Sequence, residues 1–158
     1  MTALINFNPI NTHSFYFSHL LTIGHEKIIQ LDTKTREPID EIGLYDGQNV
    51  SCLNYSLSGK LLAFATTEGF IYCRSFPEDQ AQPKAEPIQG CSKKSINFLV
   101  FSKDESLLAF ADQYFCVGLL EVETMTIKSR LKVHAKLITK LVFDPHNDLF
   151  RNMTKIRP

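Results

Sequence analysis

The sequence of 158 residues contains no tryptophan, and its seven glycines are scattered along the chain. They form neither G-x-x-x-x-G-K-[ST] nor G-x-G-x-x-G, the two spacings that cradle phosphate groups. An excess of charge is missing too, since 17 Lys and Arg balance 17 Asp and Glu. The sequence therefore lacks the motifs of nucleotide-binding enzymes, and we expect no nucleic-acid partner, because nucleic-acid binding needs a basic surface.

Long hydrophobic runs are also missing. The apolar runs reach only about five residues, whereas a membrane-spanning helix needs ~18 or more. The first residues, Met1–Asn11, have neither the basic stretch nor the apolar core of a signal peptide. Hydrophobic residues make up 44% of the chain, enough to bury a core. We therefore expect a soluble cytoplasmic protein with no membrane insertion.

The four cysteines show no Cys-x-x-Cys spacing; they are Cys52, Cys73, Cys91 and Cys116. Zinc sites and the disulfides of small secreted domains usually rest on paired cysteines that recur along the chain. Three of the four fall inside expected strands, where a thiol packs as a small hydrophobic group. We therefore predict four structural thiols, with no metal, no cofactor and no disulfide.

A repeated pentapeptide is what the sequence does contain. Leu-Leu-Ala-Phe-Ala occurs at Leu61–Ala65 and at Leu107–Ala111, with an offset of 46 residues (107 − 61). Partial copies at Ile5–Pro9 and Leu141–Pro145 repeat the segment before it, in which Asn, Ser or Asp follows an aromatic residue and starts a turn. Self-similarity at about 40 to 50 residues is typical of repeat architectures.

Each copy predicts several strands separated by turns. The expected strands are 20–24, 28–32 and 38–42 in the first copy, 49–55, 60–66, 70–75 and 86–89 in the second, and 96–101, 106–111, 116–122 and 126–131 in the third. Their nearly continuous apolar runs are typical of strands buried on both faces. The sequence therefore predicts an all-β fold of packed four-stranded antiparallel sheets.

This arrangement resembles the WD40 repeat, which has four strands per ~45 residues. His134, followed by two aliphatic residues and an aromatic one, has the spacing with which a blade of this family begins. Glu68–Ile71 is similar to the family's Asp-Gly-Thr-Ile turn, and Leu31-Asp32 occupies the Trp-Asp position. The Trp position holds Arg74 and Leu120 in the other copies, so the family's usual His, Ser/Thr, Asp and Trp network cannot form in its usual composition.

The resemblance implies a partial WD40-like β-propeller over residues 1–150. It has blades at about 4–42, 49–90 and 95–131, the start of another at 134–150, and a tail at 151–158 that departs from the repeat. Propellers close with about four to eight blades. The missing blades would belong to the same polypeptide or to a partner.

An incomplete propeller is expected to leave an apolar face that another protein segment covers. We assign Leu99, Phe101, Leu108 and Phe110 of the third copy to that face. We expect further blades, another subunit or a second copy of the chain to cover it.

No group of residues predicts catalysis or metal binding. His13, His19 and His25 recur every six residues, but they fall on a loop, a strand start and a turn. The oxygen-rich segment Asp144–Asp148 lacks the glycine and the distal glutamate of a calcium loop and aligns with plain turns. We therefore predict that the protein is not an enzyme.

In the WD40 family, loops between blades and the turns between second and third strands form the commonest docking face. The resemblance therefore gives these candidate partner-binding residues: Tyr45, Asp46, Thr67, Glu68, Lys93, Lys94, Tyr114 and Phe115. Aromatic residues at loop tips contribute disproportionately to binding. Tyr114 and Phe115 either bind a partner or cover the edge of the blade, and both interpretations stay open.

The predicted function is a non-catalytic protein–protein interaction scaffold, a WD40-repeat segment of a larger assembly whose partners are other proteins. The stretch Phe101–Asp112 is similar to the Phe-rich blades of ciliary axoneme, cytoskeletal and trafficking scaffolds. This similarity implies a cytoplasmic location, with the cilium axoneme or the cytoskeleton as the site of assembly. The alternatives are a propeller subunit of an enzyme and a truncated product without a function of its own.

Overall fold

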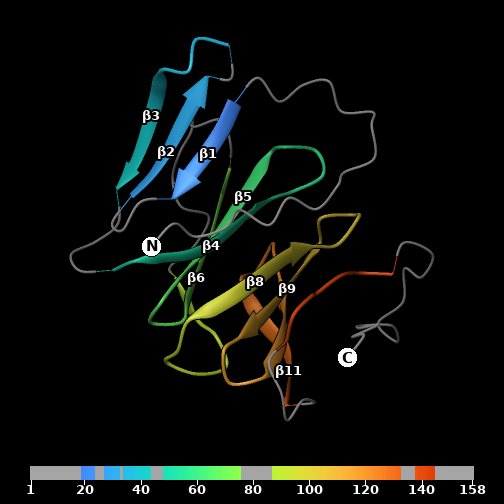
Figure 1. Cartoon of the computed structure of the whole chain (residues 1–158). Coiled ribbons are helices and arrows are strands. Elements are labelled where there is room, and N and C mark those ends of the chain that lie inside the picture. The colour runs from blue at the N-terminus through green and yellow to red at the C-terminus, as the bar shows by residue number, and fades with distance from the viewer. Residues whose placement is uncertain are drawn as a thin grey trace. The chain divides into compact units, whose positions relative to one another are not determined.

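The computed structural model describes residues 19–23, 27–32, 34–43, 48–75, 87–132 and 138–144. Over these residues the chain is all-β, with strands β1 to β11 in three antiparallel sheets and no helix (Figure 1). In this described part, no helix has the length and apolar character needed to cross a membrane. The chain divides into two compact units, Met1–Val50 and Ser51–Pro158.

The first unit contains a three-stranded sheet in the order β1-β2-β3. Its strands are β1 (His19–Ile23), β2 (Lys27–Asp32) and β3 (Pro38–Gly43). Asp32 ends β2, and its Oδ1 accepts hydrogen bonds from the backbone N–H groups of Lys34 (2.6 Å) and Thr35 (2.9 Å), which shapes the turn into β3. The segment Ile5–Pro9, expected to start this copy, lies outside the described residues, as do His13, His25 and His134.

The second unit contains two four-stranded sheets, ordered β4-β5-β6-β7 and β8-β9-β10-β11. Their strands are β4 (Val50–Tyr55), β5 (Leu61–Thr66), β6 (Phe70–Ser75), β7 (Ile88–Gln89), β8 (Ile96–Phe101), β9 (Leu107–Asp112), β10 (Cys116–Glu121) and β11 (Thr126–Lys132). The all-β prediction and its antiparallel four-stranded sheets are confirmed. All the predicted strands begin and end within two residues of the observed ones.

The repeated pentapeptide sets how these two sheets pack. Side chains alternate between the faces of a strand, so Leu108 and Phe110 of β9 point to one face and the two alanines between and after them point to the other. Leu108 and Phe110 are fully buried in a core that includes Ala63 and Ala65 of β5. The large side chains of the later sheet therefore fill the space over the small side chains of the earlier one, where β5 lies against β8 (Figure 1).

The other face of the later sheet is covered by residues 138–144. Ala109 and Ala111 share a second buried core with Ile138 and Leu141, and Phe143 packs against its edge. These residues come from the partial fourth copy of the repeat. As at the first contact, large apolar side chains from a later segment of the chain cover the alanines of an earlier strand.

This arrangement corrects the expectation about the uncovered face. Leu99, Phe101, Leu108 and Phe110 do not lack a neighbour: all four are buried in the core shared with the preceding sheet. The four residues do share one face, as expected, but the expectation named the wrong neighbour for it, because alternation in a strand defines two faces and does not say which sheet packs on each. The opposite face of the later sheet is the one that residues 138–144 contact.

The turns that begin the second strand of each sheet are also copies of one another. Ser56 Oγ accepts a hydrogen bond from Leu61 N (3.1 Å), and Ser102 Oγ accepts one from Leu107 N (2.9 Å). Glu105 has a φ of 62° in the second of these turns, and its carboxylate accepts hydrogen bonds from the backbone N–H and the hydroxyl of Ser58. The two equivalent turns are therefore hydrogen-bonded to each other at one end of the sheets.

The turn after β8 predicts a dependence of stability on pH. The hydroxyl groups of Ser102 and Ser106 donate to the Asp104 carboxylate and lower its pKa. A carboxylate whose pKa is lower in the folded state stabilises the fold above its unfolded pKa of about 3.9, and this contribution is lost as the pH falls through the folded pKa. Between about pH 7 and pH 3, urea unfolding should therefore show a larger loss of stability for the wild type than for Asp104→Asn. Equal losses in the two proteins would contradict this assignment.

Candidate partner-binding surface

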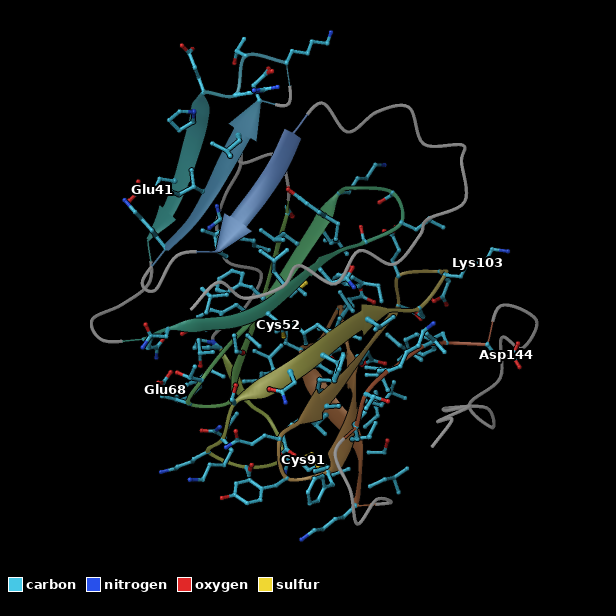
Figure 2. All side chains as sticks on the ribbon, in the orientation of Figure 1. Glu41, Cys52, Glu68, Cys91, Lys103 and Asp144 are labelled. Atoms are coloured by element: carbon cyan, nitrogen blue, oxygen red, sulfur yellow. A yellow bond between two sulfur atoms is a disulfide. The ribbon has the colours of Figure 1, made fainter. Side chains whose placement is uncertain are left out.

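Three connections of the second unit meet at the end of the sheets opposite to the paired serine turns. They are the β5–β6 turn (67–69), the β7–β8 loop (90–95) and the β9–β10 turn (113–115), and we call them together the loop cluster. Figure 2 shows Glu68 and Cys91, from two of these connections, at the same end of the second unit, and Lys103 far from both. The loop cluster is where the sequence placed most of its candidate binding residues.

The β5–β6 turn is closed by a glycine that the neighbouring loop covers. Gly69 has a φ of +84°, and its N–H donates to the Thr66 carbonyl (3.1 Å). A Cβ added to Gly69 would lie 2.3 Å from the Ser92 carbonyl oxygen and 2.8 Å from that of Lys94. The absence of a side chain at this position therefore lets the β7–β8 loop lie directly on the turn.

Gln89 fastens the same turn to the loop through its side-chain amide. Its Nε2 lies within hydrogen-bonding distance of the carbonyl oxygens of Glu68 (3.1 Å), Gly69 (3.1 Å) and Ser92 (3.0 Å). In the backbone, Gly90 N donates to the Gly69 carbonyl (2.9 Å). One side chain at the end of β7 thus holds two connections of the loop cluster together.

Asp112, at the end of β9, organises the third connection. Its side chain is buried, and its Oδ1 accepts hydrogen bonds from Tyr114 N (2.8 Å) and Cys116 N (3.0 Å). Its Oδ2 accepts a hydrogen bond from Ser92 Oγ (2.8 Å). Because one carboxylate shapes the β9–β10 turn and also holds the β7–β8 loop, the two connections are fixed relative to each other.

A disulfide joins Cys91 of the loop to Cys116 at the start of β10, with a Cα–Cα distance of 6.2 Å. The prediction of four structural thiols is therefore wrong for this pair. The two residues are 25 positions apart, and it is the packing of one sheet on the next that brings them together, which spacing in the sequence does not reveal. Cys52 and Cys73 lie in β4 and β6 as thiols, as predicted.

The sulfur atoms of this pair and the Asp112 carboxylate lie within 4.8 Å of one another. Two cysteines and an aspartate are ligands that zinc accepts. In the disulfide state, however, the two sulfur atoms are bonded to each other, and the carboxylate accepts three hydrogen bonds from its surroundings. The absence of a metal site in this protein stays a prediction.

The outer side of the loop cluster carries the predicted residues. Thr67, Lys93 and Lys94 are exposed, as is Tyr114, whose exposed fraction of 49% is among the largest for a big hydrophobic side chain in the described part of the chain. The Lys94 Nζ lies 5.6 Å from the centroid of the Tyr114 ring, within the range of a cation–π contact. An aromatic ring and a cation are therefore presented together at the surface.

Six of the eight candidate residues lie in the loop cluster: Thr67, Glu68, Lys93, Lys94, Tyr114 and Phe115. The remaining two, Tyr45 and Asp46, fall outside the described residues. The candidate set thus draws on all three connections and on both sheets, and its role in binding stays a prediction.

Phe115 has an unusual backbone conformation for a bulky residue. Its φ is 68°, and it occupies the same place in its turn as Gly69 does 46 residues earlier (115 − 69), where φ is +84°. The left-handed region costs a residue other than glycine about 1–2 kcal/mol. Three other non-glycine residues of the described chain, Arg36, Glu105 and Met125, also have a positive φ, so this conformation alone assigns no function to the Phe115 ring.

The residues that organise the loop cluster were not singled out from the sequence. This group consists of Gln89, Ser92 and Asp112. A signal existed for Asp112, which follows Thr66 by the repeat offset of 46 (112 − 66). Thr66 Oγ1 accepts a hydrogen bond from Phe70 N (3.1 Å), just as Asp112 does from Cys116 N.

The contact at Gly69 predicts a loss of stability on substitution. Gly69→Ala should cost about 2 kcal/mol, because alanine is disfavoured at positive φ and its Cβ would collide with the Ser92 carbonyl. Urea unfolding measures this cost. A matched control is Gly59→Ala, which also has a positive φ (73°) but whose counterpart in the sister turn is Glu105, so that a side chain is accepted there. Equal costs at both positions would contradict the role given to the loop contact.

The second unit thus consists of two packed four-stranded antiparallel sheets, with three of its connections gathered in the loop cluster. No family model matches the chain. The chain is similar to the mouse (Mus musculus) protein named "Cilia- and flagella-associated protein 251", with 32% identity over 108 residues. The aligned part covers 65% of this chain and 8% of that relative, so the chain spans only a small part of the relative's length.

Proposed function

We propose that the chain is a non-catalytic protein–protein interaction scaffold and that the loop cluster is its docking face. The observation that carries this proposal is the gathering of six candidate residues from three connections into one surface. Gln89, Asp112 and the disulfide tie the connections together before any partner arrives. A surface ordered in advance loses little conformational entropy on binding, which favours affinity.

The two four-stranded sheets are, in this proposal, successive blades of a WD40-like propeller. Three features support it: the strand order repeats, equivalent turns recur 46 residues apart, and the later sheet packs its large side chains on the alanines of the earlier one. Blades that each bury a face against the next are the basis of propellers and other repeat architectures. Further blades would then follow the contact made by residues 138–144.

We further propose that the scaffold works in the cilium, as a segment of a larger assembly. The name of the mouse relative supports the location, and the fact that the chain spans 8% of it agrees with a segment of something larger. The similarity of the Phe-rich stretch Phe101–Asp112 to the blades of ciliary scaffolds also supports this location, as a resemblance only. Expression of the tagged chain in ciliated cells tests the location, because a signal excluded from the axoneme would contradict it.

Substitution of the two aromatic residues at the β9–β10 turn tests whether the loop cluster is the docking face. Tyr114→Ala with Phe115→Gly should reduce the recovery of partner proteins at least ~10-fold, as expected when central aromatic residues are lost from an interface. Glycine suits the positive φ at 115, as Gly69 shows in the equivalent turn, so stability should change by no more than about 1 kcal/mol. Quantitative mass spectrometry of proteins co-purified from ciliated cells measures recovery, and urea unfolding checks the fold.

The chain offers a matched control for this experiment. Leu57 has an exposed fraction of 54% and lies in the β4–β5 turn, at the opposite end of its sheet from the loop cluster. Leu57→Ala should leave the recovered proteins unchanged. If both variants recovered the same proteins in the same amounts as the wild type, the loop cluster would not be the docking face.

A further inference from the structure

The disulfide is a covalent bond of the loop cluster that reduction can break and oxidation can form again. Cys91 belongs to the loop that leaves the earlier sheet, and Cys116 is the first residue of β10 in the later sheet. Both residues are half-buried, at the same end of the second unit as the exposed Lys93, Lys94 and Tyr114. A small thiol in solution can therefore approach the bond from the outer side of the loop cluster.

We propose that Cys91 and Cys116 form a reversible thiol–disulfide site whose co-reactant is a small thiol such as glutathione, and whose state sets how firmly the β7–β8 loop is held. The proposal rests on the proposed function for its setting, since a ciliary scaffold works in a reducing compartment. In such compartments the disulfides that do form are usually transient and regulatory. The site would regulate the docking face that the same loop builds.

The reaction conserves atoms and electrons. A glutathione thiolate attacks one sulfur atom of the pair, the S–S bond breaks, and the other cysteine leaves as a thiolate that takes up a proton. A second glutathione thiolate attacks the mixed disulfide, which releases the second cysteine and forms glutathione disulfide. Two electrons pass to the pair, the two glutathione thiols supply the two protons, and glutathione disulfide drives the reverse reaction.

The structure explains why opening the bond would loosen the loop without unfolding the sheets. Ser92 Oγ would still donate to Asp112, and the Gln89 amide would still reach the Ser92 carbonyl. The backbone N–H of Gln113 also donates to the Ser95 carbonyl (3.0 Å), beyond the bridged residue. The loop would therefore stay near its place but open more often, because hydrogen bonds alone would hold it.

Cys52 provides an internal control for the chemistry. Its thiol lies in β4 and donates a hydrogen bond to the Ile96 carbonyl (3.3 Å). Burial of this thiol raises its pKa to about 12, so almost no thiolate forms at neutral pH. Because the thiolate is the reactive species, Cys52 should remain unmodified under conditions that interconvert Cys91 and Cys116.

The test is a redox titration of the purified full chain. The protein is equilibrated with mixtures of glutathione and glutathione disulfide, quenched with acid and treated with a thiol-reactive label after unfolding, and mass spectrometry counts the label at each cysteine. Cys91 and Cys116 should gain and lose label together, with more than half of the pair reduced in excess glutathione and reoxidised by glutathione disulfide. Hydrogen exchange of residues 92–95 should become roughly tenfold faster on reduction, while β9 is unchanged.

Two results would overturn the proposal: a bond that resists glutathione, or a reduction that leaves exchange of the loop unchanged. The variant Cys91→Ser with Cys116→Ser, which cannot form the bond, should exchange like the reduced wild type, whereas Cys52→Ser should behave like the wild type. None of these measurements uses a partner protein. If the docking experiment with Tyr114 and Phe115 failed, the redox titration and the hydrogen exchange could still be interpreted. If the redox experiments failed, the docking experiment could still be interpreted.

Discussion

Phe110→Ala should lower the free energy of unfolding by about 3–5 kcal/mol, the range measured when a large aromatic residue is removed from a core. The Phe110 ring is fully buried in the core between the two four-stranded sheets, among residues that include Ala63 and Ala65. Removal of the ring leaves a cavity at the contact that joins one sheet to the next. Urea unfolding followed by circular dichroism measures the effect.

The equivalent residue of the earlier sheet is a comparison within the same chain. Phe64 is also buried, with an exposed fraction of 4%, and stacks on Tyr72 with a distance of 4.8 Å between ring centroids. Phe64→Ala should therefore cost about as much as Phe110→Ala. Tyr114→Ala, at an exposed position, should cost less than ~0.5 kcal/mol. A loss below about 1 kcal/mol for both phenylalanines would refute the repeat register.

Gly118→Ala is expected to be the most damaging of the small substitutions, with a loss of about 3 kcal/mol, at the upper end of the range for overpacking a core. Gly118 pairs with Phe110 across β9 and β10. A Cβ added to Gly118 would lie 2.0 Å from Cζ of the Phe110 ring and 2.4 Å from Cε1. Because the ring is buried, it has little room to move away.

A double-mutant cycle separates this collision from other effects of the substitution. In the background of Phe110→Ala the ring is gone, so Gly118→Ala should cost less than ~0.5 kcal/mol, which gives a coupling energy of about 2–3 kcal/mol between the two positions. A cost of about 3 kcal/mol in both backgrounds would show that the ring is not the cause. The unfolding free energies of the four proteins complete the cycle.

The earlier sheet solves the same packing problem with a different pair of residues. Tyr72 precedes Gly118 by the repeat offset of 46 (118 − 72) and pairs with Phe64 across β5 and β6. There the two rings stack with an angle of 6° between their planes. In the later sheet a single ring lies over the bare backbone of a glycine. The backbone arrangement is thus repeated, while the volume at the cross-strand pair is divided differently.

The strands could be predicted because the signals for them are local and occur more than once. The pentapeptide and the turn residues before it recur at a fixed offset, so each copy checked the boundaries of the others. The same offset relates Gly69 to Phe115, and this pairing shows from the sequence that a non-glycine residue replaces glycine in one of two equivalent turns. Repetition in the sequence therefore predicted the strands and the turns between them.

The features that were missed depend on how one sheet meets the next. The disulfide joins residues that no repeat relates, since Cys91 lies in a loop between sheets and Cys116 begins a strand. The side chain of Gln89 bonds to carbonyl groups, which every residue has, so no partner side chain marks it in the sequence. The expectation that the face with Leu108 and Phe110 lacks a neighbour was wrong, because the pattern of large and small residues defines the two faces of a sheet but does not say which segment packs on each face.

The pentapeptide also gives the row of sheets a direction. Its second leucine and its phenylalanine project from one side of a sheet, and its first leucine and its alanines lie on the other, so the two sides are complementary and different. About a two-fold axis a sheet of this kind would bring two bulky or two shallow sides together, whereas a head-to-tail arrangement brings a bulky side onto a shallow one. Any segment that continues the row beyond β8–β11 must therefore offer large side chains to Ala109 and Ala111, as Ile138 and Leu141 do.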